Sequence, residues 1–171
     1  NGDPVPWELC ATMNNHWCYC NYDHDYKSPQ LIIRKLVECV SKGGNMILNV
    51  GPDARGNIPK ESLAILEEIG EWMKLNGDSI YGCGKSELPK PEWGRYTQKD
   101  DVIYAHVYET PLGALPLTGV GPKELDKVYY LANGSEMKRG EAWNTALSAM
   151  KTAKVNLMLP KFETETSLDL T

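Results

Sequence analysis

The 171-residue chain lacks features that would point to two large classes of protein. It contains no apolar run near the roughly 18 residues that a membrane-spanning helix needs. It contains no cluster of lysine and arginine, and its formal net charge of -5 gives no positive field for the phosphates of a nucleic acid. We therefore expect neither a membrane nor a nucleic acid as its partner.

Cysteine pairs typical of structural metal sites are also missing. The five cysteines are an odd number and include no C-x-x-C pair, so the sequence predicts neither a zinc site nor a complete disulfide framework. Cys18 and Cys20 would share one face of an extended segment, which leaves two metal ligands conceivable there. We interpret the cysteines instead as unpaired thiols that pack as small hydrophobic side chains.

The first part of the chain has the signals of a strand followed by an amphipathic helix. Residues 7–13 are short, mixed aromatic and apolar, and end at two asparagines, as expected for a strand. Ser28 is a typical N-cap, and Pro29 suits the first helical position. Gly43 and Gly44 then end the helix. Its apolar residues recur at helical spacing: Ile32, Leu36, Cys39 and Val40.

A second strand and helix follow. Residues 45–50 form a nearly continuous apolar run, which predicts a parallel strand buried on both faces. Pro59 opens a helix that Asn76 and Gly77 close. Its expected apolar stripe consists of Leu63, Leu66, Ile69 and Met73. The order strand, helix, strand, helix indicates parallel pairing.

The pattern changes after Gly84. Residues 85–91 contain two prolines and no apolar period, which is typical of a linker. Strand signals separated by turns follow at residues 102–108, 127–131 and 155–159. These features predict an all-β module, which we interpret as a small antiparallel sandwich.

Three short motifs carry a resemblance to a known family. They are Pro6–Cys10 (PWELC), Met13–Tyr19 (MNNHWCY) and Lys42–Pro52 (KGGNMILNVGP). Together they resemble the last barrel strands of the α-L-fucosidases of glycoside hydrolase family 29. The resemblance extends over the whole chain and is strongest over residues 6–84.

The resemblance implies an α/β plus all-β architecture. Residues 1–84 would be the last two βα units of a (β/α)8-like barrel, and residues 85–171 a C-terminal β-sandwich domain that is itself incomplete. A whole barrel needs roughly 250 residues, so this chain can hold only part of one. Residues 1–4 contain neither an initiator methionine nor a signal peptide, and we expect the chain to begin within a longer protein.

The resemblance also implies an activity. The complete protein would be a retaining exo-α-L-fucosidase that removes terminal α-L-fucose from glycans or glycoconjugates, without a metal or an organic cofactor. Its nucleophile would lie outside this chain, so the chain alone would be inactive. Its partners would be fucosylated glycans and the missing N-terminal barrel portion, and the family favours a secreted or periplasmic location. The alternative is a stand-alone carbohydrate-binding or interaction module, which would have no need for two βα units with exposed apolar faces.

Glu8 is the carboxylate that falls inside a family-like motif. It stands beside Trp7 in a partly apolar strand, an environment that favours the protonated form a general acid needs. The resemblance leaves two roles open for Glu8. It is either the acid/base of the reaction or a group whose hydrogen bonds orient the strand and its neighbours.

Trp17 and His16 are the candidate substrate-binding residues. The resemblance places the Trp17 ring against the sugar, where it would cover C–H groups or the methyl group of fucose. Alternatively Trp17 packs under a loop. The family has glycine where this chain has Cys18, which puts the local backbone in question. His16 would donate a hydrogen bond at the pocket rim, or it is an exposed or core histidine.

Two further groups of polar residues leave their roles open. The segment 22–26 combines one histidine with two aspartates, and we interpret it as a polar loop rather than a metal site. Asn45 and Asn49 bracket the second strand. Bracing of the barrel floor and a role at its mouth are equally compatible with their positions.

Overall fold

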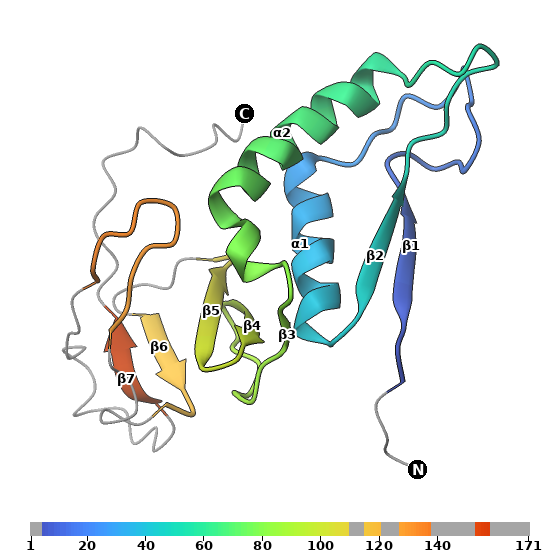
Figure 1. Ribbon diagram of the computed structural model, residues 1–171. Coiled ribbons are helices and arrows are strands. Elements are labelled where there is room, and N and C mark those ends of the chain that lie inside the picture. Colours follow the sequence, from blue (N-terminus) through green and yellow to red (C-terminus); the bar gives the residue numbers. More distant parts are fainter. Residues whose placement is uncertain (1–4, 110–114, 121–126, 138–152, 158–171) are drawn as a thin grey trace. The chain divides into compact units, whose positions relative to one another are not determined.

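The computed structural model describes residues 5–109, 115–120, 127–137 and 153–157. Its chain divides into two compact units, Asn1–Tyr108 and Glu109–Thr171. The first unit contains two helices, a parallel strand pair and an antiparallel sheet (Figure 1). Among the described residues, no helix is long and apolar enough to cross a bilayer.

The parallel pair consists of β1 (Glu8–Thr12) and β2 (Asn45–Asn49). The two strands run in register from Glu8 opposite Asn45 to Thr12 opposite Asn49. The prediction of a parallel pair is therefore confirmed. Both helices lie on one side of this pair (Figure 1).

Helix α1 (Pro29–Ser41) begins and ends where the sequence predicts. The Ser28 hydroxyl accepts a hydrogen bond from the backbone N–H of Leu31 at 3.2 Å, which satisfies one of the free donors at the helix start. Gly43 has a φ of 74°, a left-handed conformation that glycine adopts without strain. The chain can therefore turn sharply from α1 into β2.

Helix α2 (Lys60–Asn76) packs three of the four predicted apolar residues, Leu66, Ile69 and Met73, against the core, and the prediction is wrong only for Leu63. Leu63, which we expected in the apolar stripe, is 46% exposed, whereas Ser62 and Ile65 are buried. Leu66 and Ile69 pack partly buried against the core. The buried face thus includes Ser62, a polar residue that the apolar pattern alone does not predict.

The core of this unit lies between the β1–β2 pair and the helices. Met13, Ile32 and Ile65 are buried together, and side chains from β2 pack against them. The opposite face of the pair carries Glu8, Cys10, Asn45 and Ile47, all exposed. The Ile47 side chain is 50% exposed. The prediction of a strand buried on both faces is therefore wrong for the described residues, because none of them covers this face.

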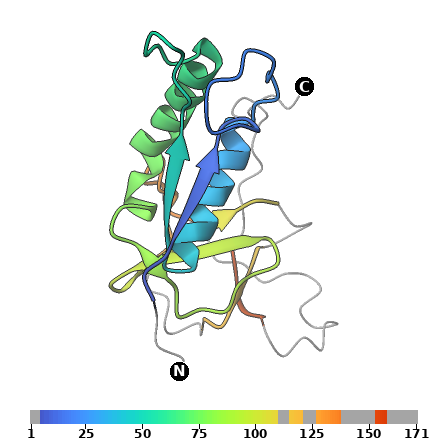
Figure 2. The ribbon, with the colours of Figure 1, turned by 90° about the vertical axis from the view of Figure 1, so that its right-hand side faces the viewer.

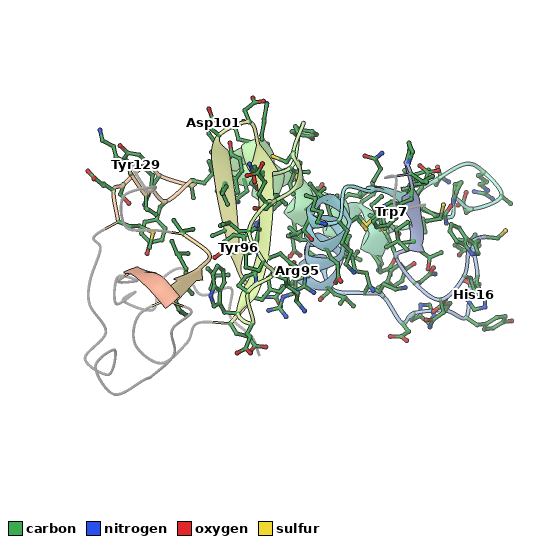
Figure 3. The ribbon with its side chains drawn as sticks, turned by 90° about the horizontal axis from the view of Figure 1, so that it is seen from below. Trp7, His16, Arg95, Tyr96, Asp101 and Tyr129 are labelled. Carbon is green, nitrogen blue, oxygen red and sulfur yellow. The ribbon has the colours of Figure 1, made fainter. Side chains whose placement is uncertain are left out.

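The antiparallel sheet consists of β3 (Gly84–Lys85), β4 (Gly94–Lys99) and β5 (Val102–Val107), in that order. Arg34 of α1 donates a hydrogen bond to the Tyr108 carbonyl at 3.1 Å, and the Tyr108 hydroxyl donates to the Arg34 carbonyl at 3.2 Å. Arg95 of β4 is directed toward α1 (Figure 3), where it bonds Glu38 at 3.3 Å.

These contacts place residues 84–108 in the first compact unit, whereas the sequence predicts a domain boundary between residues 84 and 85. The composition of residues 85–91 cannot predict this ion pair and these hydrogen bonds, because they join segments that are far apart in the sequence. The division of the complete protein into domains stays a prediction.

The second unit contains β6 (Leu115–Thr118) and β7 (Ala153–Leu157), which pair antiparallel. The strand predicted at residues 127–131 is instead an isolated bridge between Tyr129 and Glu136. Strand β7 covers part of the predicted strand 155–159, whose last two residues lie outside the described ones.

Candidate functional site

The candidate site is formed by the loops that follow β1 and β2. Because the strands are parallel and in register, both loops leave the same end of the pair, as Figure 2 shows. In parallel α/β structures the carboxyl ends of the strands are where binding and catalytic side chains gather. The geometry therefore supports a site at residues 13–27 and 50–59.

The first loop is held by a buried aspartate. The Asp23 carboxylate lies 2.6 Å from Nδ1 of His16 and accepts the backbone N–H of Asn15 at 2.9 Å and of Asp25 at 3.2 Å. The hydrogen bond with His16 is the main cause that lowers the pKa of Asp23. Asp23 is thus an ionised anchor for the loop. The segment 22–26, interpreted as a polar loop, contains this anchor.

His16 itself faces solvent. Its side chain is 57% exposed, and it lies in the loop beyond β1, away from Trp7 (Figure 3). One ring nitrogen is occupied by Asp23, so Nε2 is the nitrogen available to another molecule. The same loop is closed at its base by Lys27, whose ammonium donates to the Asn14 carbonyl at 2.6 Å.

Trp17 lies at the outer part of the loop with its side chain 55% exposed. Its carbonyl accepts a hydrogen bond from Nδ2 of Asn49, the last residue of β2, at 2.6 Å. Gly51 has a φ of 51°, and a Cβ there would lie 3.3 Å from the Trp17 carbonyl oxygen. The left-handed backbone therefore falls on Gly51, and Cys18 does not adopt a positive φ. The ring of Trp17 is free while its backbone is held by the neighbouring strand.

Glu8 lies at the other end of the pair. It is the first residue of β1 and is exposed, and Thr12 at the site end is about 13 Å further along the strand at roughly 3.3 Å per residue. The structure does not bring Glu8 together with Trp17 or His16. Its neighbour Trp7 packs against Gly44, where a Cβ would overlap the indole ring. In this chain the contact requires a glycine at position 44.

A hollow of about 310 Å³ lies between the two loops and is lined by parts of residues 19–26 and 53–61. Its second wall is braced by Asp53, which accepts backbone N–H groups of Arg55 and Asn57 at 2.8 Å each. These bonds, with Asn57 as the main contributor, lower the pKa of Asp53. Within the described ranges, no group of three or more His, Cys, Asp or Glu side chains is placed to hold a metal ion.

Comparisons with known sequences agree on one family. The family model for α-L-fucosidase matches residues 1–78. The α-L-fucosidase of Dictyostelium discoideum is 37% identical over 110 residues, which cover 61% of this chain and 24% of that protein. The human tissue α-L-fucosidase is 30% identical and covers 81% of this chain and 30% of that protein. The chain thus spans about a quarter to a third of these curated relatives.

Solved structures give the same result. The α-L-fucosidase isoenzyme 1 of Paenibacillus thiaminolyticus has a TM-score of 0.86 and 48% identity, over 93% of this chain and 37% of that one. A family 29 α-L-fucosidase of Bacteroides thetaiotaomicron, trapped as a covalent intermediate, has a TM-score of 0.77 and 30% identity. The match covers 94% of this chain and 36% of that one. The chain resembles the C-terminal part of a family 29 α-L-fucosidase.

The fucosidase motifs now have structural partners within the chain. The first overlaps the start of β1, and the second lies in the loop anchored by Asp23. The third spans β2 and includes Gly51, where a Cβ would come close to the Trp17 carbonyl. Sequence reasoning singled out Trp17, His16 and Glu8 but missed Asp23 and Gly51 as supports. An aspartate in a polar loop seven residues after His16, and a Gly-Pro pair after a strand, are the signals that indicate them.

Proposed function

We propose that the complete protein is a retaining exo-α-L-fucosidase that hydrolyses terminal α-L-fucose from glycans or glycoconjugates, with its nucleophile outside this chain. The observation that carries the proposal is the similarity of the whole described fold to solved α-L-fucosidases at up to 48% identity. The covalent intermediate of the Bacteroides enzyme supports the retaining route, because only that route passes through a glycosyl-enzyme.

The β1–α1–β2–α2 segment would be the last two units of a (β/α)8 barrel. Its exposed face, with Cys10 and Ile47, supports this, because in such a barrel one face of every strand points into a packed interior. The rest of the barrel would cover this face and pair with the open strand edges. A stand-alone module would leave the same face and edges uncovered, which argues against that alternative. The strands after residue 84 would belong to the appended sandwich.

Trp17 would cover the apolar side of fucose. Its exposed ring and restrained backbone support this role, because a positioned aromatic surface suits the C–H groups and methyl of a deoxy sugar. His16 would present Nε2 at the rim of the same site, with Asp23 fixing the ring orientation.

Glu8 would act as a brace rather than as the acid/base. Its place at the first residue of β1, on the exposed face beside Asn45, supports a role in orienting strands inside the barrel. If so, Glu8→Gln in the complete protein should slow activated and unactivated fucosides alike, and azide should not rescue it. Selective loss on poor leaving groups together with azide rescue would identify Glu8 as the acid/base.

The activity is tested on the complete protein with an aryl α-L-fucoside. We expect turnover whose first-formed product is α-L-fucose, seen by NMR before mutarotation. Trp17→Ala should weaken fucose binding by about 1 to 3 kcal/mol with little change in melting temperature. Absence of fucoside hydrolysis, or formation of β-L-fucose first, would refute the proposal.

A further inference from the structure

The hollow between the two loops is separate from the residues assigned to fucose. Neither Trp17 nor His16 lines it, although both belong to the loop that forms one wall. Tyr19 and Tyr26 contribute aromatic side chains to the lining, and Asn21, Asn57 and Lys60 contribute polar groups. The volume of about 310 Å³ is at the lower end of the range for small-ligand pockets, roughly 300 to 1,000 Å³.

Two carboxylates of the hollow, those of Asp53 and Asp23, are held in place before any ligand arrives. Asp53 is fixed by three hydrogen bonds from Arg55 and Asn57, and Asp23 by its bonds to the first loop. The Tyr19 hydroxyl donates to Oδ1 of Asn21 at 3.2 Å, and the Tyr19 side chain is 47% exposed. An aromatic ring beside fixed acceptors is a preorganised surface.

The charges decide which class of ligand fits. The lining contains three carboxylates (Asp23, Asp53 and Glu61) against one ammonium group (Lys60) and His24, and Asp23 is already paired with His16, so the lining does not favour an anion. The same carboxylates form no group arranged for a metal ion, among the residues that the structure describes. A neutral molecule with hydroxyl groups both donates to carboxylates and amide oxygens and accepts from Lys60 and amide N–H groups.

We propose that this hollow binds a neutral sugar ring of the glycan chain that carries the fucose. The inference rests on the proposed fucosidase activity and gives it a preference for oligosaccharides over simple fucosides. Tyr19 packs against one face of the ring, and the carboxylate and amide groups of the two loops bond its hydroxyls. The fucose then lies toward Trp17, two residues away on the same loop.

The experiment compares two substrates in the complete protein. One is an aryl α-L-fucoside, whose aglycone carries no sugar, and the other is the better hydrolysed of 2′-fucosyllactose and 3-fucosyllactose. For each variant the ratio of kcat/KM for the trisaccharide to kcat/KM for the aryl fucoside is measured. Tyr19→Ala and Lys60→Ala remove groups from the two walls. Tyr22→Ala is the matched control, because Tyr22 lies in the same loop, is 91% exposed and does not line the hollow.

We expect Tyr19→Ala to lower the ratio about 10-fold, the size of one lost aromatic contact, and Lys60→Ala to lower it about 3-fold. Tyr22→Ala should leave the ratio unchanged. The inference would be overturned if both lining variants left the ratio unchanged, or if Tyr22→Ala lowered it as much as they do. It would also be overturned if the wild-type enzyme hydrolysed the aryl fucoside and neither trisaccharide. A wild-type enzyme that hydrolyses no fucoside at all would instead overturn the proposed function.

Discussion

The two sheets of the first compact unit differ in how far the chain itself completes them. The parallel β1–β2 pair packs one face on the helices and leaves the other exposed, with Ile47 at 50%. The antiparallel β3–β4–β5 sheet buries Thr97 completely and Tyr96 to 4% exposure. Among the described residues, the first sheet has an exposed face, whereas the second sheet buries β4 but leaves Val102, Ile103 and Val107 of β5 between 39% and 52% exposed. The candidate site belongs to the first.

The largest effect that would test this contrast is a truncation in the buried strand β4 of the antiparallel sheet. Tyr96 packs edge-to-face on Trp93 at 5.4 Å, so Tyr96→Ala should lower the free energy of unfolding by about 3 to 5 kcal/mol. Tyr96→Phe is the matched control. The buried hydroxyl has no hydrogen-bond partner among the described residues, so its removal should be neutral or stabilising. Denaturant unfolding of wild type and both variants measures the difference, and a destabilised Phe variant would show a missed partner.

The second effect is a pH dependence that also belongs to the antiparallel sheet. Burial lowers the pKa of His106 from 6.5 to about 4, and its Nε2 lies 3.0 Å from the Thr97 hydroxyl. Since the unfolded chain takes up a proton that the folded chain refuses, stability is full above about pH 6.5 and falls toward pH 4 by about 3 kcal/mol. His106→Gln should remove this part of the dependence in thermal unfolding curves between pH 7 and pH 4. An identical slope in the variant would assign the titration to another group.

The third effect concerns the exposed face of the parallel pair. Ile47→Ala in the 171-residue chain should cost less than about 1 kcal/mol, because half of the side chain already meets solvent. In the complete protein the same change should cost about 2 to 4 kcal/mol if the proposed barrel buries it. Melting temperatures of the variant in both lengths give the comparison. Equal small costs would mean that nothing covers this face.

The smallest effect separates the two asparagines of β2. Asn49→Ala removes the bond to the Trp17 carbonyl and should weaken fucose binding in the complete protein by about 1 kcal/mol. Asn45→Ala, at the far end of the same strand face, is the matched control and should leave binding unchanged. Binding of fucose by calorimetry provides the readout. A loss from Asn45→Ala of the same size would point to the strand as a whole rather than to the loop.

The local part of the fold was predictable from sequence, and the long-range part was not. Ser28, Pro29 and the Gly43–Gly44 pair define α1 through capping and backbone geometry, which depend on neighbours in sequence. The exposure of Ile47, the burial of Ser62 and the attachment of residues 84–108 through Arg34 depend on what lies beside them in space. At the candidate site, Trp17 and His16 follow from the motif. Their supports, Asp23, Asn49 and Gly51, are separated from them by up to 34 positions.

We infer that this chain supplies a binding loop of the enzyme and that the catalytic nucleophile lies outside the chain. The most direct test is aryl α-L-fucoside hydrolysis by the purified 171-residue chain and, in parallel, by the complete protein. We expect turnover by the complete protein and none above background by the 171-residue chain. Turnover by the short chain that persists through repurification would contradict it and place the catalytic pair within these residues.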